Sequence, residues 1–119
     1  SLAPPGSLSP LEVFENLALA ASLDGKLDPA ERELLEAKAG ALGLDQATVR
    51  DAIARVARRE LSAFHVPTSE AARKRVLADV LRVLRADGAL AVPEQRALNT
   101  LVRELQLSEA DVQRAFRGS

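Results

Sequence analysis

Residues 24–31 read DGKLDPAE, and residues 87–94 read DGALAVPE. Both follow the pattern Asp-Gly-x-Leu-x-x-x-Glu, and the offset between them is 63 residues, counted from Asp24 to Asp87. Glycine after Asp ends a helix readily because it adopts the left-handed conformation, and a proline shortly before Glu suits the first turn of a helix. Each copy therefore predicts a helix, an acidic turn and a second helix.

Apolar positions on both sides of these turns repeat at the same offset. Leu42, for example, corresponds to Leu105. We predict a duplicated unit whose two copies are residues 10–60 and residues 73–117. Neither copy would bury its apolar faces alone, so we expect the two to pack as one domain over residues 10–117.

The composition favours helix. Alanine, leucine, arginine and glutamate are abundant, and these residues are strong helix formers. No stretch alternates apolar and polar residues as a β-strand would. A chain of 119 residues is also long enough to bury one core without disulfide or metal support. We therefore predict an all-α fold of about six to seven helices.

Capping residues set the expected helix boundaries. Ser, Asp or Thr before a helical pattern accepts hydrogen bonds from the first backbone amides, and Asp28 with Glu31 predicts a reciprocal capping box. The caps Ser9, Asp28, Asp45, Thr68 and Ser108, together with Pro93, predict helices over about 10–22, 29–42, 46–61, 69–86, 93–105 and 109–116. The widest apolar face lies on the fourth of these helices, which we expect at the centre of the fold.

Residues 1–9 contain two prolines and a glycine, which disfavour regular structure. We predict that they form a flexible linker or the remnant of a tag. The apolar runs fall far short of the ~20 residues that cross a bilayer, so we expect no transmembrane segment. We predict a cytoplasmic location, with residues 1–9 as the place where a tether to a membrane or a larger protein would attach.

A family resemblance follows from the order of short motifs. A helix ending in Ala86-Asp87-Gly88, then a hydrophobic residue, a Glu and a Leu-Gly-Leu or Leu-x-Leu turn, resembles the TerB-like family. That bacterial family includes the tellurite-resistance TerB proteins and the membrane-proximal domain of DjlA-type co-chaperones. The resemblance covers residues 10–117. It implies an all-helical fold of two related halves with neighbouring acidic loops, and a non-catalytic role in scaffolding or stress-associated complexes.

The acidic turns admit two interpretations. Carboxylate oxygens are the ligands that Ca²⁺ and Mg²⁺ prefer, and the resemblance implies divalent-metal binding in some family members. A metal site would use Asp24, Asp28, Glu31, Asp87 and Glu94. Helix capping explains the same side chains without a metal, and Ala91 stands where the first copy has Asp28. No other cofactor is predicted.

His65 is the only histidine, and the chain has no cysteine, so no zinc site is indicated. We expect His65 to pack beside Phe64 in the connection between the two copies. Basic residues cluster at residues 55–59 and 73–75, with Arg82 and Arg85 after them. Such clusters contact nucleic acid or an acidic partner in some proteins, but most are solvated helix faces.

The function predicted from these patterns is that of a non-enzymatic protein-interaction or scaffolding module in a larger assembly. No catalytic residue is predicted, because no nucleophile, general base or phosphate-binding loop has the required neighbours. The first alternative is a regulatory domain that binds a divalent cation at the acidic turns. The second is a weak nucleic-acid binder, which the net charge of −1 and the scarcity of aromatic residues disfavour.

Overall fold

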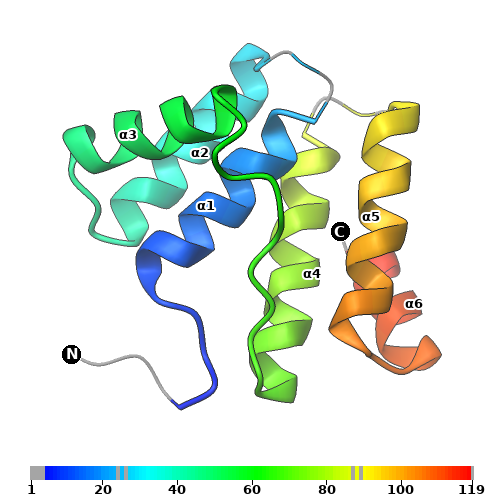
Figure 1. Cartoon of the computed structure of the whole chain (residues 1–119). Helices are drawn as coiled ribbons and strands as arrows, with labels where there is room; N and C mark the ends of the chain where they lie inside the picture. The colour runs from blue at the N-terminus through cyan, green and yellow to red at the C-terminus, as the bar shows by residue number, and fades with distance from the viewer. Residues whose placement is uncertain (1–4, 24, 26, 87, 89, 119) are drawn as a thin grey trace.

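The computed structural model describes residues 5–23, 25, 27–86, 88 and 90–118. These residues form six α-helices and no strand, which confirms the all-α prediction (Figure 1). The helices are α1 (Pro10–Ala21), α2 (Pro29–Ala41), α3 (Gln46–Ala57), α4 (Glu70–Leu84), α5 (Val92–Leu105) and α6 (Glu109–Gly118). Within the described part of the chain, no helix combines the length and the apolar character needed to cross a membrane.

Four of the five predicted side-chain caps are observed. The Ser9 hydroxyl accepts a hydrogen bond from the Glu12 backbone N–H at 3.2 Å, and Glu12 accepts one from the Ser9 N–H at 2.9 Å, which completes a capping box. Asp28 forms the same reciprocal pair at the start of α2. Asp45 and Ser108 accept from the third amide of α3 and of α6. These starts were predictable because a cap and its amides lie within one turn of each other.

Two predicted boundaries are wrong. Ser69, not Thr68, caps α4, and its hydroxyl accepts from the Ala72 N–H at 3.2 Å. The Thr68 and Ser69 amides both donate to the Gly6 carbonyl, at 3.1 and 3.0 Å, so a distant segment fixes this backbone. The third helix ends at Ala57 rather than near Leu61, because the next turn passes through a left-handed residue, Arg59, with φ of 62°.

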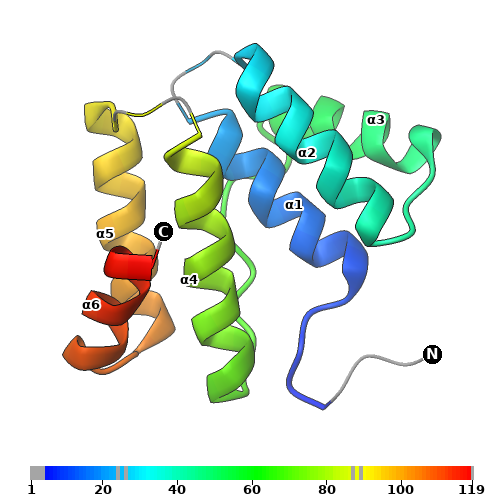
Figure 2. The same ribbon diagram turned by 180° about the vertical axis from the view of Figure 1, so that it is seen from behind.

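The helices are arranged around α1 and α4, which lie against each other (Figures 1 and 2). The α1 helix also contacts α2 and α3, and the α4 helix also contacts α5 and α6. The expectation that the fourth helix alone is central was therefore incomplete. Every α1 residue from Phe14 to Ala21 is buried, because the small side chains of its last turn let neighbouring helices approach on several sides.

The core is apolar and continuous across all of these contacts. Its largest fully buried apolar side chains are Phe14, Leu17, Leu77, Val80, Leu81, Val83, Leu84, Leu101 and Leu105. The α6 helix differs, because none of its residues is fully buried. Residues 5–9 cover the start of α4, with Leu8 packed against the core. One half of the molecule thus carries a helix that is only partly embedded.

Candidate interaction surface and the acidic turns

The residues of the predicted metal site have separate surroundings. Asp24 and Asp87 lie outside the described residues. The Asp28 carboxylate accepts from the Glu31 N–H at 2.8 Å as the cap of α2. Glu31 and Glu94 are 0% and 1% exposed, and each accepts a hydrogen bond from a backbone N–H three residues earlier. The described acids of the turns therefore serve as helix caps.

Among the residues that the structure describes, no group of three or more His, Asp and Glu side chains is placed to hold a metal ion. The metal hypothesis consequently depends on Asp24 and Asp87, and it stays a prediction. In the second turn, Ala91 provides only the backbone half of a capping box, because its N–H donates to Glu94 at 2.8 Å and its methyl group accepts nothing.

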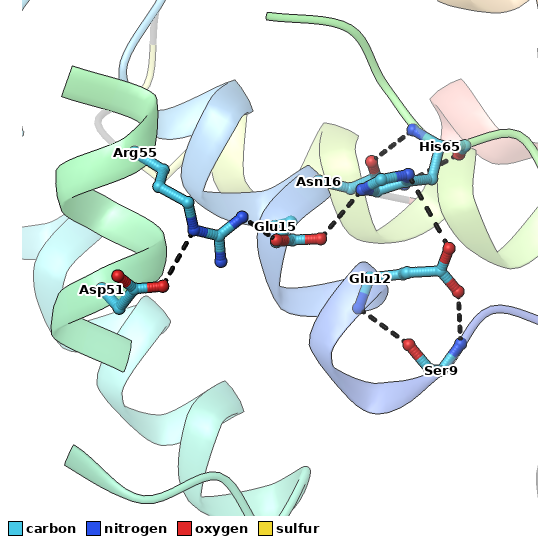
Figure 3. Close-up of polar contacts among 7 residues, drawn as sticks. All are labelled: Ser9, Glu12, Glu15, Asn16, Asp51, Arg55 and His65. Carbon is cyan, nitrogen blue, oxygen red and sulfur yellow. Dashed lines mark hydrogen bonds and ion pairs between the residues drawn. The ribbon is translucent and has the colours of Figure 1, made fainter. Parts of the chain in front are cut away.

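A buried carboxylate on α1 connects polar side chains of α3 and of the segment between α3 and α4 (Figure 3). Glu15 is 6% exposed, and its two oxygens contact the Arg55 guanidinium of α3 and the His65 ring, the latter at 2.9 Å. Arg55 also binds Asp51 at 2.9 Å. The hydrogen bonds to Glu15 and Asp51 raise the pKa of Arg55, so this cation stays charged.

Asn16 fixes the backbone at the same place. Its side-chain amide donates to the His65 carbonyl at 3.0 Å and its oxygen accepts from the His65 N–H at 2.7 Å (Figure 3). The connection between α3 and α4 is thereby attached to α1. His65 was expected in this connection, but its contacts with Glu15 and Asn16 were not predicted, because these residues lie about 50 positions earlier in the chain.

The basic clusters are largely occupied by contacts within the chain. Arg58 pairs with Glu60. Arg73 donates to the Leu105 carbonyl at 2.7 Å. Arg85 donates to the Phe116 carbonyl at 2.8 Å, and its guanidinium lies 5.4 Å from the centre of that ring. The guanidinium groups of Arg58, Arg73 and Arg85 thus have acceptors within the chain, and the nucleic-acid alternative stays a prediction.

A groove of about 310 Å³ lies between α4 and α6. Its apolar surface comes from Ala78 of α4, Leu107 of the loop between α5 and α6, and Ala115 of α6, with the fully buried Leu77 beneath them. The helices leave this space because the residues that face each other are small. Gly118 adds to it, since a methyl group placed there would meet no other described atom within 4 Å.

Charged side chains border the groove. Lys74 and Arg82 extend from α4, and Arg114 extends from α6. Asp111 lies between two of them, 3.6 Å from Lys74 and 2.9 Å from Arg114. The hydrogen bond from the Ser108 hydroxyl lowers the pKa of Asp111, with a smaller contribution from these two cations, so the carboxylate stays ionised. Lys74 also pairs with Glu70 at 3.1 Å. Arg82 has no ion pair within the described residues, so it is the border cation whose charge is available to a partner.

No family model, no curated protein and no solved structure matches this chain. The TerB-like resemblance therefore stays a prediction. None of the groove residues was predicted as a site from the sequence, although Lys74 and Arg82 belong to the basic residues noted there. No pattern within one helix indicated that Ala78 of α4 would line the same groove as Ala115 and Gly118 of α6. The two helices lie side by side only in the folded chain (Figure 2).

Proposed function

We propose that this chain is a non-enzymatic protein-interaction module that docks a partner protein in the groove between α4 and α6. The observation that carries the proposal is the combination of an apolar floor and a charged border in one groove. Protein interfaces combine these two features, because the apolar centre contributes affinity and the polar rim contributes specificity.

The fold supports a role of this kind. Six helices bury one core around α1 and α4, so the groove has a rigid wall in α4, where Leu77 is 0% exposed. The other wall, α6, is held from one side and has no fully buried residue. A surface made by one fixed and one lightly embedded helix can adapt to a partner without disturbing the core.

The polar cluster of α1 supports the non-enzymatic part of the proposal. Both oxygens of Glu15 are bonded to Arg55 and His65 within the chain. The His65 backbone is in turn held by Asn16. These side chains already stabilise the junction of α1, α3 and the following connection, so they act as structural groups in this proposal.

We further propose that the module is a TerB-like domain with a scaffolding role in a larger, stress-associated assembly of the bacterial cytoplasm. Support comes from the all-helical architecture and from the two Asp-Gly-x-Leu-x-x-x-Glu turns between helices α1 and α2 and between α4 and α5.

Site-specific photo-crosslinking in cells tests the docking surface. A photoreactive side chain replaces Ala78 in the groove, and the control replaces Gln113, an exposed residue of α6 that does not line the groove. We expect a discrete protein adduct at position 78 that disappears when Ala115→Leu fills the groove. Adducts of equal yield and identity at positions 78 and 113 would refute docking in the groove.

A further inference from the structure

The shape of the groove restricts its occupant. Lys74, Ala78 and Arg82 follow one another at four-residue spacing along α4, so this wall extends for about 12 Å at the rise of an α-helix. Asp111, Ala115 and Gly118 occupy successive turns on the facing side of α6. A groove between two helices that runs along both of them fits a third helix lying in it.

The floor demands an apolar face on that helix. The side chains of Ala78, Leu107 and Ala115 are half-buried and offer only carbon atoms to the groove, and the two alanines leave room for larger side chains from outside. An occupant would therefore place aliphatic or aromatic residues at i, i+3 or i+4, and i+7 over this floor. The charged phosphate backbone of a nucleic acid has no apolar face, so it would leave the floor of the groove uncovered.

The border determines the charge of the occupant. Lys74 and Arg114 share Asp111, and Lys74 also pairs with Glu70. Arg82 faces solvent without an ion pair in the described part of the chain. Three cations against two carboxylates, Asp111 and Glu70, leave an excess of one positive charge around an apolar floor. Carboxylates on both sides of the apolar stripe of a partner would meet them, whereas cations there would be repelled.

We propose that the occupant is an acidic amphipathic helix of a partner protein, with Asp or Glu side chains flanking its apolar stripe. This inference rests on the proposed function, which it deepens by naming the chemistry of the partner. Arg82 is the main specificity residue in this arrangement, because Asp111 already binds the other two cations.

The test uses the full 119-residue chain as bait for a displayed library of helical peptides, with an apolar stripe kept constant and all flanking positions randomised. We expect Asp and Glu to be enriched beside the stripe and the affinity of selected peptides to fall as salt is raised. Arg82→Glu should weaken binding about tenfold or more. The matched control, Arg96→Glu on α5, makes the same charge change outside the groove and should leave binding unchanged.

A charge exchange makes the test specific. Replacing the flanking acids of a selected peptide by lysine should abolish binding to the wild-type chain and restore binding to Arg82→Glu. Circular dichroism and thermal unfolding of each variant establish that it is folded. Because Arg82 is exposed and lies on the rim, we expect the Arg82→Glu variant to keep the fold.

The outcomes of these experiments distinguish the acidic helix as occupant from the proposed docking function of the groove. Peptides without acidic enrichment that are still blocked by Ala115→Leu would overturn the acidic partner and leave the groove as a docking surface. Peptides that bind equally to the Ala115→Leu variant would overturn both. Failure to select any peptide would overturn the inference, while the crosslinking experiment decides the proposed function. Self-association of the chain that Ala115→Leu abolishes would identify a second copy as the occupant and overturn it as well.

Discussion

The first three helices and the last three differ in how the third helix of each set is attached. The α3 helix buries Ala52 and Val56 and is joined to α1 through the Glu15–Arg55 ion pair (Figure 3). The α6 helix buries no residue fully, and a groove separates part of it from α4. We call the contact between two such helices a seam. The α1–α3 seam is closed by the ion pair, whereas the α4–α6 seam is left open by the groove.

The difference shows where a small helical domain can place a binding surface. A seam that is closed by buried polar contacts is rigid and specific, and it has no surface left for a partner. A seam lined by Ala78 and Ala115 has unfilled space that a partner can occupy. Matched substitutions in the α1–α3 seam and the α4–α6 seam test this contrast.

Truncation of an aromatic side chain in each region should have the largest effect. Phe14 is 0% exposed, so Phe14→Ala should lower the free energy of unfolding by about 3–5 kcal/mol. Phe116 on α6 is only partly buried, and Phe116→Ala should cost less than half as much. Urea denaturation followed by circular dichroism measures both. Equal losses would mean that α6 is as firmly embedded as α1, and the contrast would fail.

Removal of the acid within each seam should have the next largest effect. Glu15→Gln keeps the shape of the side chain but removes the buried charge that binds Arg55 and His65, and we expect a loss of about 2 kcal/mol. Asp111→Asn in the other seam should cost clearly less, because solvent screens its ion pairs. The same denaturation experiment compares the two variants, and a larger loss for Asp111→Asn would reverse the proposed difference.

Sequence patterns predict the local parts of this structure and miss the parts that long-range contacts decide. Ser9, Asp28 and Asp45 were identified as caps because each acts on amides within its own turn. The cap of α4 was displaced by one residue because the Gly6 carbonyl, far away in the chain, binds the backbone there.

Long-range contacts also explain why the groove was not predicted from the sequence. Periodicity identified the buried face of α4 but gave no indication that Ala78 would face Ala115 across an unfilled space. Glu15 and Asn16 were also missed, since a polar residue on a helix becomes a buried partner only when another segment supplies His65 and Arg55. The residue pattern of one helix does not predict which residues of other segments will contact it.

The substitutions Asp28→Ala and Ala91→Asp, at equivalent positions of the two acidic turns, test both the helix caps and the metal hypothesis. Asp28→Ala should cost about 1 kcal/mol through loss of the α2 cap, and Ala91→Asp should stabilise by a similar amount, because Ala91 already has the extended backbone of a cap. Thermal unfolding in EDTA and with Ca²⁺, Mg²⁺ or Mn²⁺ measures both. An equal loss for Asp28→Ala in all buffers would limit Asp28 to capping, whereas a cation-dependent stabilisation that this variant loses would support a metal site.

The smallest effect on the free energy of unfolding should come from lowering the pH, which protonates the Glu12 carboxylate at the start of α1. The Ser9 backbone N–H donates to Glu12 and lowers the pKa of that carboxyl below its ordinary value of 4.5, with a smaller contribution from nearby His65. The unfolded chain therefore binds this proton more readily than the folded one, so the stabilisation is present above about pH 4.5 and is lost as pH falls through the lower folded value.

Glu12→Gln isolates this contribution, because glutamine keeps the shape of the capping box without the charge. We expect the variant to be less stable than the wild-type chain near neutral pH and the difference to shrink as pH falls below about 4.5. The start of α4 is the internal comparison, since Ser69 caps it through a hydroxyl and Ala72 stands where α1 has Glu12. Ser69→Ala should therefore give a loss that stays constant over the same pH range. A Glu12→Gln difference that is equally constant would mean that the charge of Glu12 contributes nothing to the α1 cap.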